Sequence, residues 1–206
     1  MVDIKVYFNK TGRVKFIAHL DTYRTFIRAF RRTDIPVWYT EGFNPQVYLN
    51  FTLPVSLGVE SYNDSFIFRL VSDYPLDKIP DELNKYLPEG ITCLKAELAN
   101  KKEAPIVAAE YEIIFDNISK EDLESILSRD DLTYEKMGKV RGRKTTKVVN
   151  LSENILSYDV TDNGNTVTLN IKMTAGSNLT PSPVKLCNSL GVEPILMKRL
   201  RIIRDS

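Results

Sequence analysis

Residues 3–33 read DIKVYFNKTGRVKFIAHLDTYRTFIRAFRRT, and the period of their hydrophobic pattern changes once along the stretch. The first eight residues alternate between apolar and polar side chains, which predicts a strand. A Thr-Gly turn signal at 11–12 precedes a second short apolar piece at 14–18. From His19 onward the apolar residues recur at helical spacing, so an amphipathic helix is predicted over 19–33. Its apolar stripe consists of Leu20, Tyr23, Ile27 and Phe30.

The rest of the first half continues with further strands and one more helix. Strands are predicted at 35–39, 47–53, 65–71 and 91–98, and a helix at 75–87. The residues EGFNPQ at 41–46 form a loop rich in turn-forming residues. The polar stretch at 99–105 has no periodicity and suits a linker.

The second half repeats this order of elements without repeating the sequence. Strands are predicted at 108–116, 132–138, 165–173 and 194–203, and helices at 119–127 and 182–191. Ser119 is the predicted N-cap of one helix, and Gly191 closes the other. Each half matches the βαββαβ order of a ferredoxin-like domain. We predict an α+β fold of two tandem ferredoxin-like units with antiparallel sheets, at 1–98 and 106–206.

With one His and two Cys, the chain lacks the side chains for several kinds of metal chemistry. A multi-His zinc site, a zinc finger and a three-cysteine iron–sulfur motif are excluded, so no metal and no cofactor are expected. Cys93 and Cys187 are expected to be buried free thiols of a reducing compartment. No apolar run reaches ~18 residues and the polar start lacks a signal-peptide core, which predicts a cytoplasmic protein without membrane contact.

Basic residues are concentrated in three windows, although the whole chain has 28 basic and 27 acidic residues. The windows 24–32, 139–147 and 198–204 together hold 13 basic and no acidic residues, which leaves 15 basic against 27 acidic elsewhere. Basic segments that contain no acidic residue, in a chain that is acidic elsewhere, are typical of a surface that binds a polyanion. RNA is therefore the predicted ligand. The alternative is that these residues only solvate exposed faces.

The basic residues of the predicted 19–33 helix share one face. At roughly 100° per residue they lie within an arc of about 100°, away from the apolar side. They are Arg24, Arg28, Arg31 and Arg32. Like charges at i,i+4 repel by about 0.2–0.5 kcal/mol. We therefore expect an anionic partner, either acidic residues elsewhere in the fold or a bound phosphate backbone.

Two loops carry the remaining predicted RNA contacts. Phe43 could stack on a base and Asn44 could read a base edge; alternatively, Phe43 fills the core and Asn44 only supports a turn. The stretch 139–147 could form a basic hairpin, with a merely solvated loop as the alternative. Its cations are Lys139, Arg141, Arg143, Lys144 and Lys147.

His19 is the only imidazole of the chain and therefore a candidate general base near neutral pH. The helical wheel places it within the apolar arc, not on the arginine face. That position favours a structural role, either capping the helix or packing against the core. Contact with RNA or a partner is the third possibility.

Residues 15–46, KFIAHLDTYRTFIRAFRRTDIPVWYTEGFNPQ, resemble a bacterial family of radical SAM-linked or radical SAM-associated proteins, a domain of unknown function. In that family the segment runs Ser-His-Leu-Asp, then a helix ending Arg-Arg, then Tyr-Ser-Glu-Gly-Phe-Asn-Pro-His. This chain has Ala18, Thr40 and Gln46 where the family commonly has Ser, Ser and His. Family members are found beside, or fused behind, cobalamin-binding radical SAM proteins, so the resemblance implies such a partner.

These observations predict an RNA-binding accessory protein that acts with a radical SAM enzyme in RNA modification. The chain lacks the three closely spaced cysteines of the radical SAM cluster, so it is not that enzyme. Two alternatives stay open. One is a metal-independent endoribonuclease that uses His19, and the other is a protein-interaction module that docks the radical SAM partner without RNA.

Overall fold

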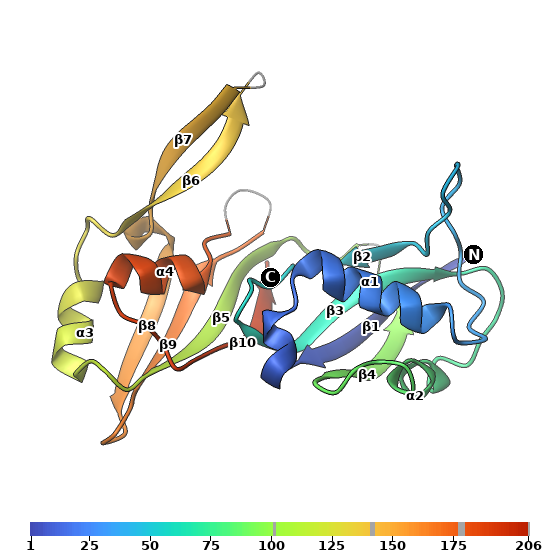
Figure 1. Cartoon of the computed structure of the whole chain (residues 1–206), viewed down its shortest axis with the longest axis horizontal. Helices are drawn as coiled ribbons and strands as arrows, with labels where there is room; N and C mark the ends of the chain where they lie inside the picture. The colour runs from blue at the N-terminus through green and yellow to red at the C-terminus, as the bar shows by residue number, and fades with distance from the viewer. Residues whose placement is uncertain (101, 141–142, 177–179, 206) are drawn as a thin grey trace. The chain divides into compact units, whose positions relative to one another are not determined.

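The chain divides into two compact units, which we call unit 1 (Met1–Ala104) and unit 2 (Pro105–Ser206). The computed structural model describes residues 1–100, 102–140, 143–176 and 180–205 (Figure 1). Within these residues each unit is an α+β structure with an antiparallel sheet and two α-helices. No helix of the described residues is both long enough and apolar enough to span a bilayer.

The sheet of unit 1 has the strand order β4-β1-β3-β2, and all neighbouring strands are antiparallel. Along the chain its elements are β1 (Val2–Lys10), the 3-10 helix η1 (Gly12–Phe16), α1 (His19–Phe30), β2 (Leu49–Phe51), β3 (Glu60–Leu70), α2 (Lys78–Asn84) and β4 (Ile91–Leu98). The order along the chain is therefore strand, helix, two strands, helix, strand, whereas three strands were predicted between the helices.

Aromatic side chains fill the core between this sheet and α1. Phe66 of β3 is fully buried at its centre. Its ring centroid lies 4.7 Å from Phe26, 5.5 Å from Phe51, 5.8 Å from Phe8 and 6.1 Å from Phe30. These separations are in the favourable range for aromatic pairs. Ile79 and Leu83 of α2 join the same core, so both helices of unit 1 pack on one cluster.

Two apolar pieces of unit 1 do not form strands, and for one of them, 35–39, a strand was predicted. The apolar piece at 14–18 lies largely in η1, where Val14 is buried and its carbonyl accepts a hydrogen bond from the Ile17 N–H at 3.0 Å. Residues 35–39 form only isolated bridges, Val37 to Leu70 and Tyr39 to Val47. Pro36 explains the second case, because proline has no N–H to donate to a ladder.

The predicted apolar stripe of α1 is wrong at one position. Leu20 is 66% exposed, whereas Phe26, Ile27 and Phe30 are buried. At about 100° per residue, Leu20 lies roughly 100° from the centre of the buried arc and close to the azimuth of Arg24. Leu20 therefore belongs to the arginine side of the helix.

Unit 2 has the strand order β10-β5-β9-β8, again antiparallel. Its elements are β5 (Ile106–Phe115), α3 (Lys120–Leu127), β6 (Thr133–Val140), β7 (Arg143–Asn150), the 3-10 helix η2 (Ser152–Asn154), β8 (Ile155–Asp162), β9 (Val167–Thr174), α4 (Pro183–Leu190) and β10 (Leu196–Arg204). Both helix-end predictions are confirmed: the Ser119 hydroxyl accepts from the Asp122 N–H at 3.1 Å, and Gly191 ends α4 with φ +70°.

The strand predicted at 132–138 is assigned to the wrong sheet. Residues 133–140 form β6, which pairs with β7 in a separate hairpin between α3 and β8. The strand beside β9 is β8 instead, which the sequence prediction missed. Only Val160 of β8 is buried, because β8 is the last strand of its sheet, so its sequence shows little apolar alternation.

The buried aromatic cluster makes a quantitative prediction. Phe66→Ala should lower the free energy of unfolding by about 3–5 kcal/mol, because it leaves a cavity among four rings. Urea unfolding followed by fluorescence of Trp38, the only Trp of the chain, reports on unit 1. The control is Phe43→Ala, an exposed aromatic that should change stability by less than about 0.5 kcal/mol. Equal effects of the two variants would contradict this description of the core.

Candidate nucleic-acid interface

The four arginines predicted on the basic face of α1 are all exposed in the structure. Arg24 forms an ion pair with Asp21 one turn earlier, with Nη1 and Oδ1 3.0 Å apart. Among the described residues, neither the Arg28 nor the Arg32 guanidinium has an ion-pair or hydrogen-bond partner, although the Arg32 backbone N–H donates to the Ala29 carbonyl. The acidic partner expected within the fold is thus present for Arg24 and absent for these two.

The loop at 41–46 is the tip of a hairpin-like segment, residues 37–49, which we call the arm. Two backbone hydrogen bonds close it, from the Thr40 N–H to the Gln46 carbonyl at 2.8 Å and from the Tyr48 N–H to the Trp38 carbonyl at 3.2 Å. The arm projects from unit 1 beyond the C-terminal end of α1 (Figure 1). Phe43, at the tip, is fully exposed, so the alternative in which it fills the core is wrong.

A chain of side-chain hydrogen bonds joins the end of α1 to the tip of the arm. Arg31 donates from Nη2 to Gln46 Oε1 at 3.0 Å, and Gln46 donates from Nε2 to Asn44 Oδ1 at 2.9 Å. The structure therefore joins Arg31, through Gln46, to Asn44, the neighbour of Phe43 at the tip of the arm. We call Arg28, Arg31, Arg32, Phe43 and Asn44 the arm–helix surface.

The base of the arm is held by a residue that the sequence prediction missed. The Arg69 guanidinium of β3 lies 5.2 Å from the Trp38 ring and 5.3 Å from the Tyr48 ring. Its Nε also donates to Asp3 Oδ1 at 2.6 Å. The two rings contact each other edge to face, with centroids 5.9 Å apart, so the guanidinium lies beside both rings and is attracted by each. In the sequence, Arg69 stands out only as a charged residue within the apolar strand predicted at 65–71.

The basic window 198–204 does not present free cations, although it contains no acidic residue. Lys198 Nζ donates to Glu112 Oε1 at 2.6 Å, and Arg201 makes two hydrogen bonds to Glu110, at 2.5 and 2.9 Å. The Arg201 hydrogen bonds lower the pKa of Glu110. Arg199 is buried. The acidic partners come from β5, which is adjacent in the sheet and distant in sequence.

The window 139–147 lies at the turn of the β6–β7 hairpin. Its backbone register places Lys139 opposite Lys144 and Val140 opposite Arg143. Residues 141 and 142 lie outside the described residues, as do the side chains of the predicted contacts Lys139, Arg141, Arg143, Lys144 and Lys147. The arm–helix surface is therefore the part of the prediction that the structure describes in atomic detail.

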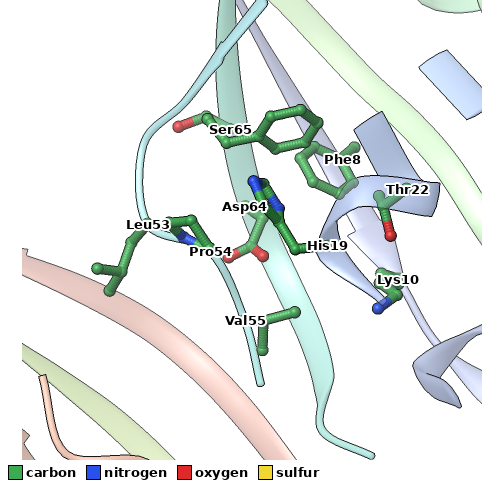
Figure 2. A pocket seen from close by; sticks show the side chains of 10 residues that line it. Phe8, Lys10, His19, Thr22, Leu53, Pro54, Val55, Asp64 and Ser65 are labelled. Atoms are coloured by element: carbon green, nitrogen blue, oxygen red, sulfur yellow. The ribbon is translucent and has the colours of Figure 1, made fainter. Parts of the chain in front are cut away.

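His19 faces a small cavity of unit 1 (Figure 2). Its ring packs edge-on against Phe51, with centroids 5.2 Å apart, and the cavity is also lined by Lys10, Asp64 and Ser65. The cavity volume of about 10 Å³ is enough for one water molecule. His19 makes no capping bond, because Ala18 is the N-cap and has no side-chain donor or acceptor. This geometry assigns His19 a packing position, with no room for a nucleotide.

The two cysteines are free and buried, as predicted. Burial raises the pKa of both thiols to about 12. A thiol with so high a pKa is not a nucleophile at neutral pH. In the described part of the chain, no group of three or more His, Cys, Asp or Glu side chains is placed to hold a metal ion.

The fold and this surface define an α+β protein whose most distinctive feature is a basic helix end joined to an aromatic-tipped arm. The chain belongs to DUF2344, a family described as an uncharacterized protein conserved in bacteria, which is matched over residues 4–182. No curated protein matches the chain.

One solved structure with a similar chain is titled "Crystal Structure of a Cbf5-Nop10-Gar1 Complex". The alignment has a TM-score of 0.48 and 8% sequence identity, and it covers 98% of this chain and 50% of the other. The chain therefore spans about half the length of that relative. A likeness at this level supports no statement about function.

The cavity around His19 makes a prediction about pH. Burial, and secondly the charge of Lys10, lower the pKa of His19 from its ordinary value of 6.5. A proton-detected NMR titration of the single imidazole should give a midpoint below 6.5. The folded state favours the neutral ring more strongly than the unfolded state does, so the stabilisation is complete above pH 6.5 and is lost as the pH falls through the lowered pKa. A midpoint at or above 6.5 would contradict the half-buried position of the ring.

Proposed function

We propose that this chain is an RNA-binding accessory protein that acts with a radical SAM enzyme in RNA modification. The observation that carries the RNA part is the arm–helix surface. Arg31 at the end of α1 is hydrogen-bonded to the arm, whose tip exposes Phe43, and the exposed side chains of Arg28 and Arg32 have no ion-pair or hydrogen-bond partner among the described residues. Phosphates pair with guanidinium groups, and unstacked bases pair with aromatic rings.

The exposed ring of Phe43 is the feature that the fold alone does not explain. A large apolar side chain left in water gains nothing from folding, and a contact would remove it from water. Nucleic-acid bases supply a flat apolar surface, and their backbone supplies the anions that Arg28 and Arg32 lack. A single ligand class satisfies both groups.

The fold proposal is that each unit is ferredoxin-like. Support comes from the strand order β4-β1-β3-β2 in unit 1 and the equivalent order β10-β5-β9-β8 in unit 2. In both units two strand–helix–strand segments interlock in one antiparallel sheet, which is the split βαβ arrangement. Unit 2 then differs by the inserted hairpin β6–β7.

The radical SAM partner is proposed from the resemblance of residues 15–46 to radical SAM-linked proteins. This chain has two cysteines, 94 positions apart in sequence, and cannot hold the cluster. It would therefore act by presenting RNA to a cobalamin-binding radical SAM protein. The residues of this chain in that role are those of the arm–helix surface.

The phosphate contacts can be tested by charge removal. Arg28→Ala combined with Arg32→Ala should weaken binding of a labelled RNA by about tenfold at about 100 mM salt. The slope of log Kd against log salt concentration should fall by about 1.4, because two phosphate contacts are lost. Fluorescence anisotropy over a salt series measures both quantities.

A matched control separates this effect from net charge. Arg129→Ala combined with Arg201→Ala also removes two exposed arginines, but each of these already pairs with a carboxylate. The control should keep the native salt slope. Similar losses in the two double variants would mean that only net charge matters, and absence of saturable binding in the native protein would remove the RNA proposal.

The partner can be tested by co-purification. We expect a tagged form of this chain to retain a cobalamin-binding radical SAM protein from the same genome. Retention that survives nuclease and high salt, together with no RNA affinity, would favour the protein-interaction alternative. If no such protein is retained with or without RNA, the partnership is rejected.

A further inference from the structure

We infer that the arm–helix surface selects unpaired nucleotides, with one base stacked on Phe43 and the flanking phosphates at Arg28 and Arg32. The ligand class is single-stranded RNA or the loop of a stem-loop, in preference to a duplex. This inference rests on the proposed function and goes beyond it by naming the form of RNA that is bound.

The first step is the position of Phe43. Its ring is fully exposed at the tip of the arm. Inside a duplex the faces of each base are covered by the bases above and below. The deep, narrow major groove of A-form RNA also excludes side chains from the base edges. A protruding ring therefore finds a free base face only where the RNA is unpaired.

The second step is the rigidity of the arm. Backbone hydrogen bonds close it at Thr40–Gln46 and Trp38–Tyr48, and the Arg69 guanidinium lies beside the Trp38 and Tyr48 rings at its base. Gln46 further ties the tip to Arg31 of α1. A stacking platform that is already ordered loses little conformational entropy when a base binds. The arm is thus prepared to hold a base at a fixed position relative to the arginines.

The third step concerns the direction of the hydrogen-bond chain. Arginine can only donate, so Arg31 fixes the Gln46 carbonyl oxygen toward α1 and the Gln46 amide nitrogen toward Asn44. Asn44 must then accept with Oδ1, and its Nδ2 makes no hydrogen bond among the described residues. The group offered beside Phe43 is therefore a donor, which suits a base edge that carries acceptors.

The fourth step is the side from which the backbone approaches. Glu41 is exposed two residues before Phe43 and would repel phosphates. Arg28 lies in the last turn of α1, and Arg32 lies two residues after its end. The RNA backbone should therefore run along the end of α1. Replacing the carboxylate by an amide in Glu41→Gln should strengthen binding about twofold, because one repulsion is removed.

Binding of three probes tests the inference. They are a fluorescein-labelled single strand of about 12 nucleotides, a stem-loop that carries the same sequence in its loop, and the blunt duplex of that sequence. The single strand and the stem-loop should bind at least about tenfold more tightly than the duplex. Phe43→Ala should remove most of that preference, since stacking on one aromatic ring contributes about a tenfold effect or more.

Two matched variants separate stacking from other effects. Phe43→Leu keeps an apolar side chain without an aromatic face and should behave like Phe43→Ala. Phe16→Ala removes another exposed Phe of unit 1 and should bind like the native protein. An abasic nucleotide within the single strand should lower the affinity of the native protein and leave that of Phe43→Ala unchanged.

The possible results distinguish the two levels of the proposal. If the duplex binds as tightly as the single strand, or Phe43→Ala binds like the native protein, selection of unpaired nucleotides is overturned while RNA binding stands. If none of the three probes binds, the inference fails together with the proposed function.

Discussion

The contact between Phe26 of α1 and Phe66 of β3, with ring centroids 4.7 Å apart, determines how the surface of unit 1 is arranged. It fixes the rotation of α1 about its own axis. Once Phe26, Ile27 and Phe30 face the sheet, helix geometry turns Arg24, Arg28, Arg31 and Arg32 toward solvent. The same rotation points Arg31 at Gln46, so burial of the aromatic face also positions the arm against the helix end.

The features that the sequence could predict are those with local causes. Helical spacing located α1, a Ser-x-x-Asp pattern located the start of α3, and a glycine located the end of α4. The features it could not predict depend on which strands become neighbours. Window 198–204 contains no acidic residue, yet Glu112 and Glu110 of β5 pair with two of its four cations, Lys198 and Arg201. Strand β8 was missed because an edge strand buries too few residues to show a period.

In the candidate site, too, the features with local causes could be predicted from the sequence, and the contacts between distant segments could not. Exposure of the α1 arginines could be predicted from a helical wheel, and the loop at 41–46 from its turn residues. The contact between the helix end and this loop could not be predicted, because it depends on the path of the chain from α1 back to β2 and on the contacts of Arg69 with Trp38 and Tyr48 at the base of the arm. For His19 the wheel was sufficient: it placed the imidazole in the apolar arc, and the ring packs against Phe51 beside a cavity for one water molecule.

Helix electrostatics help to decide whether the arginines or Phe43 give the stronger support for a ligand at the arm–helix surface. The C-terminal end of a helix bears partial negative charge, which stabilises nearby cations by about 0.3–1 kcal/mol. That is comparable to or larger than the repulsion between Arg28 and Arg32 at i,i+4. The arginines are therefore tolerated without any ligand, and their exposure alone is weak evidence for one. Phe43 has no such compensation, since nothing in the described structure covers its ring. Of the observations that support the proposed function, the ordered arm that ends in an uncovered aromatic ring is therefore the stronger, and the arginines bear only on the charge of the proposed ligand.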